Sequence, residues 1–465
     1  MGQIRIFILL GLFCAPAFLF AQNPQNRRSS VFQPPLVIPD TGKKITVGAR
    51  DTNINHTSTF LTLRQCIDYA MEHQPALNRS LTNVDIVHET NAVNLASWLP
   101  QVTGSGNLVH YFQQQGGGGV TTAGGTTTSG RGANSFVPEI SVNQAIFSPT
   151  LFYYHRTAPL LTEQAKEATD SAKINLVSSV TKSFYSVLLT LEQINILKED
   201  TARLGKNVRD TYHQYIGGIV DETDYEEATI TLNNSKAQLK QANENVNPQF
   251  ATLKGLMGYP PEQQFNLSFD TTQMMQAIHI DTAQQLRFEN RIEFKELATQ
   301  KNLQNELIHY YNFQWVPTVS AFFNYDLSFQ NSTSYPTSYI GLGVSVPIFT
   351  GFARLHNVKK AQLQYKQLDF TQQELKSSIY TQYSSALANY KSNYYNLQLL
   401  QRNVTLAQRT YFVVELQYKS GIVAYLNVIT AESNLITSEV NYLNALFQVL
   451  TNKVDLQKAM GLITY

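Results

Sequence analysis

The stretch YIGGIVDETDYEEA, residues 215–228, returns 203 residues later as YKSGIVAYLNVITA, residues 418–431. Tyr, Gly, Ile-Val and Ala keep their spacing in both copies, whereas the acidic residues of the first copy are absent from the second. Glycine readily takes the left-handed conformation that ends a helix. Because helical patterns flank both copies, we expect each to be the tip of a helical hairpin, with the chain reversing near Gly218 and Gly421.

Three further pairs of motifs have similar spacing, which indicates an internal duplication. The offset falls by 15 residues, from 217 to 202, across a Gly/Thr-rich stretch, residues 113–134, which lengthens the first half, and we expect an exposed loop there. The first repeat is therefore placed at 61–258, a connector at 259–281 and the second repeat at 282–465. The paired motifs are LKGLMG and LQKAMG, ending at Gly258 and Gly461; QAIFSP (144–149) and VPIFTG (346–351); and WLP (98–100) and WVP (315–317).

Each half shows the same order of expected elements. A helix comes first, two strands of period-2 alternation follow, and a long helix then leads to the tip and a returning helix with coiled-coil spacing. The long helices would measure roughly 80 and 95 Å, more than a compact domain needs. The expected first helices are 61–77 and 282–300, the strands 102–112, 136–146, 316–330 and 338–348, and the long helices 158–210 and 354–416.

The N-terminal residues 1–21 have the features of a secretory signal peptide. Arg5 precedes an apolar run from Ile6 to Phe20, and Ala21 is the small residue before a cleavage site. A single membrane anchor is the alternative, but the run is short and Pro16 interrupts it. No later stretch of 18 apolar residues predicts a transmembrane helix, and residues 22–60 are expected to form an extended arm. Cleavage would leave Cys66 as the only thiol, which excludes an intramolecular disulfide.

Strands of about ten residues with one apolar and one polar face match the length that crosses a bilayer. Four strands cannot close into a barrel, and an open sheet edge is not tolerated in lipid. We therefore predict that copies of the chain share one barrel. Aromatic residues at the strand ends suit the two membrane interfaces, with ordinary core filling as the alternative. They are Tyr111, Phe112, Phe147, Trp315, Tyr335, Tyr339 and Phe349.

With these motifs, residues 61–465 resemble the TolC family of outer-membrane efflux proteins. The resemblance implies an α+β membrane protein: a homotrimer with a twelve-stranded transmembrane β-barrel in outer-membrane lipid, four strands per chain, continued by a periplasmic coiled-coil tunnel. It also implies a passive exit duct for efflux or type I secretion, whose tips dock a periplasmic adaptor bound to an inner-membrane RND or ABC pump. No cofactor is implied.

The resemblance also assigns residues to the tips. In relatives, two aspartates of the second tip form an acidic ring that closes the tunnel; the matching positions here are Asn427 and Thr430, which are neutral. The first tip is acidic instead, so its carboxylates are candidates for adaptor docking, with a solvated charge run as the alternative. The expected docking residues are Tyr215, Gly218, Ile219, Val220, Asp221, Glu222, Asp224, Glu227, Ala228, Tyr418, Gly421, Ile422, Val423 and Ala431, and the expected gate residues are Asn427 and Thr430.

Other classes of function find little support in the sequence. A net charge of +1 without a basic patch argues against nucleic acid. No phosphate-binding loop, metal-ligand spacing or nucleophile motif occurs, so we expect neither an enzyme nor a metalloprotein. A periplasmic coiled-coil scaffold or adaptor without a pore is the alternative, but it would not need four strands of membrane-crossing length.

Overall fold

The computed structural model describes residues 60–111, 133–268, 274, 278–282, 284–326 and 338–465. The predicted signal peptide, the arm up to residue 59 and most of the Gly/Thr-rich loop lie outside these residues.

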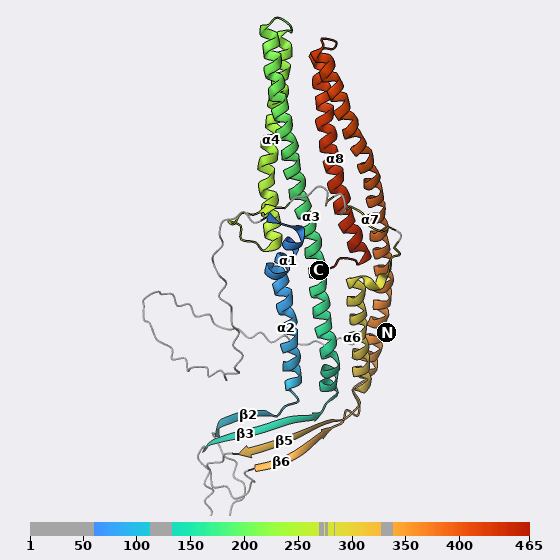
Figure 1. The fold of residues 1–465 in the computed structure, drawn as a ribbon. Helices are drawn as coiled ribbons and strands as arrows, with labels where there is room; N and C mark the ends of the chain where they lie inside the picture. Colours follow the sequence, from blue (N-terminus) through green and yellow to red (C-terminus); the bar gives the residue numbers. More distant parts are fainter. Residues whose placement is uncertain (1–59, 112–132, 269–273, 275–277, 283, 327–337) are drawn as a thin grey trace, which may run out of the picture. The chain divides into compact units, whose positions relative to one another are not determined.

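The described part contains two series of elements in the same order (Figure 1). The first series is α1 (Leu63–His73), α2 (Pro75–Ala96), β2 (Gln101–Tyr111), β3 (Ala133–Phe147), α3 (Pro149–Ile216) and α4 (Glu222–Met257). The second is the 3-10 turn η1 (Phe288–Asn290), α6 (Ile292–Phe313), β5 (Thr318–Asp326), β6 (Ser338–Ser345), α7 (Ala353–Lys419) and α8 (Tyr425–Met460). Two short strands, β1 (Phe60–Leu61) and β4 (Asn266–Leu267), pair in parallel and tie the connector to the first helix.

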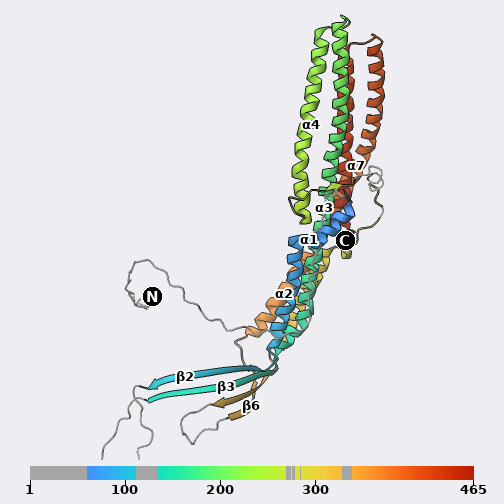
Figure 2. The same ribbon diagram turned by 60° about the vertical axis from the view of Figure 1, so that its left-hand side comes forward.

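The long helices form two hairpins, α3 with α4 and α7 with α8, and α3 also packs against α8 (Figures 1 and 2). The expected long helices are confirmed, although α3 and α7 extend beyond both predicted ends. An 18-residue window of α3 is apolar enough to pass for a membrane span, but half of it is buried, as in a core helix. The main core lies where α1, α3, α4, α7 and α8 meet the connector, and Tyr390 there donates a hydrogen bond to the carbonyl oxygen of Ile278 (2.9 Å).

Two predicted helices have other bounds in the structure. The helix predicted over 61–77 is two helices, because Pro75 lacks an N–H and holds Gln74 in an extended conformation. The helix predicted over 282–300 begins only at Ile292. Arg291 before it is 4% exposed and donates hydrogen bonds to the carbonyl oxygens of Lys458 and Ala459 (both 3.2 Å), so this segment docks onto the end of α8 instead of continuing α6.

The four longer strands form one antiparallel sheet in the order β2-β3-β5-β6, so β3 and β5 join the two halves. The four predicted strands are confirmed within the described residues, with shifted ends; residues 112 and 327–330 lie outside them. Residues 346–348 are not strand, which corrects the predicted end of β6. Ser345 pairs with Thr318, the first residue of β5, and among the described residues no strand pairs with 346–348.

The register gives the sheet one apolar and one polar face. Val102 lies opposite Val142, which lies opposite Phe323, which in turn lies opposite Ile340. Successive side chains alternate between faces, so the neighbouring row is polar: Thr103 and Ser141 are paired there, with their hydroxyls 2.7 Å apart. The exposed members of the apolar face are Val102, Leu108, Ile140, Phe323, Tyr325, Ile340, Leu342 and Val344. The strand-end aromatics Phe147, Trp315, Tyr339 and Phe349 are also exposed, so they do not fill a core within one chain.

Candidate functional site

The first hairpin turns through a glycine in the left-handed conformation. Helix α3 ends at Ile216, and Gly218 has a φ of 70°. The N–H of Gly218 donates to the carbonyl of Tyr215, and the N–H of Ile219 donates to that of Gln214, both at 2.9 Å. These two bonds are a Schellman motif, which satisfies carbonyls that the end of a helix otherwise leaves unpaired.

The second hairpin repeats this turn bond for bond. Helix α7 ends at Lys419, and Gly421 has a φ of 72°. The N–H of Gly421 donates to Tyr418 and that of Ile422 to Gln417, again at 2.9 Å. The expected tips at both glycines are thus confirmed as helix reversals, while their role in docking is a separate proposal.

Replacing Gly218 or Gly421 with Val should strain these turns without creating a clash. A β-branched residue at a positive φ costs about 1–2 kcal/mol, whereas a Cβ at either position has no neighbour within 4 Å. We expect export to fall in both variants. The assembled protein should persist, and its yield in outer-membrane fractions is the measure of assembly. Unchanged export in both would contradict a functional role for the tips.

The acidic residues surround the start of α4. Asp221 is its N-cap residue, and Glu222 and Asp224 lie in its first turn, where negative charge is favoured by the helix dipole. Burial, reinforced by the charge of Asp221, raises the pKa of Asp224, which is half-buried. Asp221, Glu222, Glu226 and Glu227 are exposed. The cluster therefore presents its carboxylates outward from the first hairpin.

The corresponding turn of α8 instead packs against the first hairpin. Tyr425, Val428, Ala431 and Leu435 form a small buried cluster with Ala228 of α4. Nearby, the Tyr418 hydroxyl donates to Gln214 Oε1 (2.5 Å), which joins the two tips directly. The two copies of the repeated motif thus lie in different surroundings: the neutral copy contributes Tyr425, Val428 and Ala431 to the contact between hairpins, whereas most carboxylates of the acidic copy are exposed.

The other predicted tip residues are placed as follows. Ile219 and Ile422 are 75% and 71% exposed at the turns, and Val220 and Val423 next to them are half-buried. Tyr215 stacks on Tyr225 across the first turn, with the ring centroids 6.5 Å apart. Asn427 and Thr430 are exposed and lie outside the buried cluster. Their predicted gating role concerns an assembly of several chains and stays a prediction.

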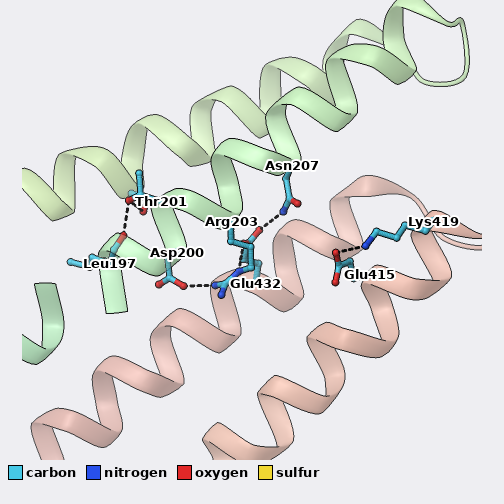
Figure 3. Close-up of polar contacts among 9 residues, drawn as sticks. Leu197, Asp200, Thr201, Arg203, Asn207, Glu415, Lys419 and Glu432 are labelled. Carbon is cyan, nitrogen blue, oxygen red and sulfur yellow. Dashed lines mark hydrogen bonds and ion pairs between the residues drawn. The ribbon is translucent and has the colours of Figure 1, made fainter. Parts of the chain in front are cut away.

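A buried ionic cluster, absent from the sequence-based site, joins α3 to α8 below the tips (Figure 3). The Arg203 guanidinium donates through Nε to Glu432 Oε1 (2.9 Å) and through Nη2 to Asp200 Oδ1. Asn207 donates to the second oxygen of Glu432 (3.3 Å), and the guanidinium lies 5.1 Å from the ring centroid of Tyr411. Glu432 and Asp200 are 0% and 1% exposed.

Burial dominates the electrostatics of this cluster. It raises the pKa of Glu432, while the hydrogen bond and charge of Arg203 act in the opposite direction. The pKa of Asp200 is raised for the same reason and opposed by the same guanidinium. Since two buried carboxyls share one cation, the charge of Arg203 is what makes their burial tolerable. The cluster can therefore hold the two hairpins together.

The sequence did contain one signal for this cluster. Glu432 falls among Val428, Ala431 and Leu435, all of which pack toward the first hairpin, and a carboxylate in an apolar seam needs a buried partner. Its partner on α3 could not be identified from helical spacing alone. Arg203 and Asp200 are three residues apart, which is also the pattern of a solvated helix face.

Other chemistry finds no support in the described residues. They contain no group of three or more His, Cys, Asp or Glu side chains that could hold a metal ion. Cys66 is free and fully buried, and burial raises the pKa of its thiol to about 12, which makes it unreactive.

Two hairpins that continue from an amphipathic four-stranded sheet are the chain fold of solved outer-membrane channels. Campylobacter jejuni CmeC aligns over 86% of this chain and 85% of its own, with a TM-score of 0.67 and 17% identity. Vibrio cholerae VceC aligns over 86% and 96%, with a TM-score of 0.67 and 14% identity. CusC aligns over 89% and 95%, with a TM-score of 0.72 and 16% identity. These likenesses define the fold. Comparison with curated proteins found no match.

The family follows from the sequence itself. The model of the outer membrane efflux protein family matches residues 66–259 and 285–462, so the chain belongs to that family. The resemblance inferred from the motifs is confirmed. The protein is an outer-membrane efflux protein, with its helical part in the periplasm, and its family is one of channels, not enzymes.

Proposed function

We propose that this protein is the outer-membrane exit duct of a tripartite export system, a homotrimer in which each chain supplies four strands to one twelve-stranded barrel. The single observation that carries the proposal is the sheet. It has an apolar face that would suit lipid and a polar face that would suit a lumen, and among the described residues no strand pairs with the outer edge of β2 or of β6. An unpaired edge is not tolerated in a bilayer, so other copies must complete the sheet.

We also propose that the chain arose by duplication of a unit of two strands and their helices. Helices α2 and α6 both have 22 residues, and α4 and α8 both have 36. The two strand hairpins have the same register: Val102 opposite Val142 corresponds to Val319 opposite Val344 at the motif offsets. Three copies of two units place six hairpins around one tunnel. This arrangement supports a duct over a scaffold without a pore, because only a duct needs the amphipathic sheet.

The tips are the proposed docking surface for a periplasmic adaptor, through which an inner-membrane RND or ABC pump, or a type I secretion pump, would deliver cargo. The experiment is site-specific photocrosslinking in cells from Ile219 and from Ile422, which are exposed at the tips. We expect the captured protein to be an adaptor of such a pump. Ile340, 80% exposed on the apolar face of the sheet, is the matched control and should capture no adaptor. Equal capture from Ile340, or no adaptor from either tip, would contradict the proposal.

The acidic first tip is the proposed electrostatic part of this docking surface. Five carboxylates per chain, from Asp221 to Glu227, give fifteen in a trimer, and such a density favours a basic partner and speeds its association at low salt. We expect conversion of the five to Asn or Gln to weaken adaptor binding and flatten its salt dependence, measured by surface plasmon resonance. Conductance of the isolated channel should stay unchanged.

The opposite outcome has a definite meaning. If the neutralised channel opens spontaneously in a planar bilayer while adaptor binding is unaffected, the acidic cluster is the gate. The proposed gating role of the neutral residues Asn427 and Thr430 would then be wrong.

A further inference from the structure

The two halves of the chain meet through α3 and α6, close to the sheet. Arg156 Nη2 of α3 donates to Glu306 Oε1 of α6 at 2.8 Å. The rings of Tyr153 and Tyr310 lie 5.0 Å apart beside this pair, and Phe152 and Phe313 line a shallow apolar cavity next to it. This contact combines one ion pair with aromatic packing.

Each residue of this contact has a counterpart in the other repeat of the chain, but these counterparts lie on separate surfaces. The starts of α2 and α6 are 217 residues apart, so Glu306 corresponds to Glu89. The tip glycines at the ends of α3 and α7, Gly218 and Gly421, are 203 residues apart, so Arg156 corresponds to Lys359. Both charges are therefore retained in sign. Lys359 is exposed, and the side chain of Glu89 is 79% exposed, with His88 Nδ1 3.5 Å from its Oε1.

The apolar residues around these counterparts are exposed as well. Val93 and Leu99, the counterparts of Tyr310 and Val316, are 70% and 63% exposed. Phe349 and Leu355, the counterparts of Phe147 and Phe152, are 75% and 63% exposed. One chain thus carries the two sides of an apolar contact on two separate surfaces. One surface is formed by α2 and the start of β2, and the other by the end of β6 and the start of α7. Large exposed apolar patches of this kind mark interfaces.

The strand edges follow the same correspondence. Asn143 of β3 pairs with Phe322 of β5 inside the chain, and their counterparts are Ser345 of β6 and Ser105 of β2. β2 and β6 are the two outer strands of the sheet, and β6 ends at Ser345, which pairs with the first residue of β5. Residues 346–348, which have strand periodicity but no strand conformation, are the segment that a neighbouring β2 would extend.

We propose that the α7–β6 surface of one copy binds the α2–β2 surface of the next copy as α3 and β3 bind α6 and β5 within a chain, with Lys359 paired to Glu89 of the next copy. The interface is head-to-tail, so repeating it closes a ring without a free edge. This inference rests on the proposed trimer and names the surfaces and the ion pair that build it.

The test uses the full chain in outer-membrane fractions, with Glu89→Cys and Lys359→Cys combined and a short bis-maleimide as crosslinker. We expect a covalent trimer on a denaturing gel. Each single variant should stay monomeric, which also excludes reaction at Cys66, and co-expression of the two single variants should give dimers and no trimer. Arg156→Cys combined with Glu306→Cys is the matched control, which should crosslink within the chain and leave a monomer.

Two results separate the inference from the proposed function. A threefold native mass without any Glu89–Lys359 crosslink, while the Arg156–Glu306 control reacts, would overturn this interface and leave the trimeric duct standing. A monomeric native mass of the unmodified protein would overturn the duct and the interface together.

Discussion

Replacing Arg203 with Met should destabilise the packing of α3 on α8 by about 3–5 kcal/mol, because it leaves two buried carboxyls without their shared cation. Glu432 is fully buried and Asp200 almost fully, so neither can recover hydration without separating the helices. The measurement is native-state hydrogen exchange at the α3 and α8 amides around the cluster. We expect their exchange to approach that of the exposed tips.

The matched control is Lys182→Met. Lys182 also pairs with a carboxylate of α8, Asp455, but these side chains are 35% and 44% exposed. An exposed pair contributes about 0–1 kcal/mol, so this variant should change exchange little. Equal effects of the two substitutions would show that burial of the Arg203 cluster has no special energetic role.

The defect of the Arg203 variant should depend on pH. Burial raises the pKa of both Glu432 and Asp200, and loss of the guanidinium raises them further. A carboxyl with a higher pKa in the folded state contributes most to stability at acid pH, and that contribution is lost as the pH rises through the raised pKa. We therefore expect the defect to be largest at neutral pH and to shrink as the pH falls and the two carboxyls become protonated. A constant defect would contradict the assignment to buried charge.

A second large effect is expected from Gly258→Ala and Gly461→Ala, at the ends of α4 and α8. Both glycines have a φ of 69°, and a Cβ atom would lie 2.6 Å from the backbone oxygen of His73 at Gly258 and 2.7 Å from that of Asn290 at Gly461. Left-handed strain and the clash with rigid backbone together should cost about 2–5 kcal/mol. Reduced thermal stability of the helical part, followed by circular dichroism, is the measurement.

Gly255 provides the control for this pair. It lies inside α4, three residues before Gly258, and an added Cβ has no neighbour within 4 Å. Gly255→Ala should raise stability by about 0.5–1 kcal/mol, since alanine favours a helix over glycine. Destabilisation by Gly255→Ala as large as that by Gly258→Ala would contradict the close-approach argument.

The tips and the strands could be predicted because their signals are local. A glycine between two helical patterns fixes a turn by its own conformational freedom, and alternation of apolar residues fixes the face of a strand. The end of β6 could not be predicted in the same way. Residues 346–348 continue the alternation, but a strand also needs a neighbour, and no strand in the described part of the chain pairs with them.

The missed features depend on contacts between distant segments. Arg291 ends the irregular segment before α6 because its partners are carbonyls of α8, 167 and 168 residues away. Arg203 and Glu432 are 229 residues apart, so helical spacing could not pair them. The break at Pro75 is different, because its signal is local: a proline at the first position of α2.

The structure explains why the first tip is acidic and the second is neutral. At the motif offset, Glu222 corresponds to Tyr425, which is 2% exposed between the hairpins. A carboxylate at that position would be buried without a cation, whereas the same position in the first tip meets solvent. Divergence of the two copies thus follows from their surroundings, and the sequence alone indicated the difference without its cause.

Four strands per chain become a channel, in the proposed function, only when three copies share one barrel. Native mass spectrometry of the protein extracted from outer membranes in mild detergent tests it most directly. We expect a particle with the mass of three mature chains and no stable smaller species. A monomer that keeps its strands under conditions where membrane barrels survive would contradict it.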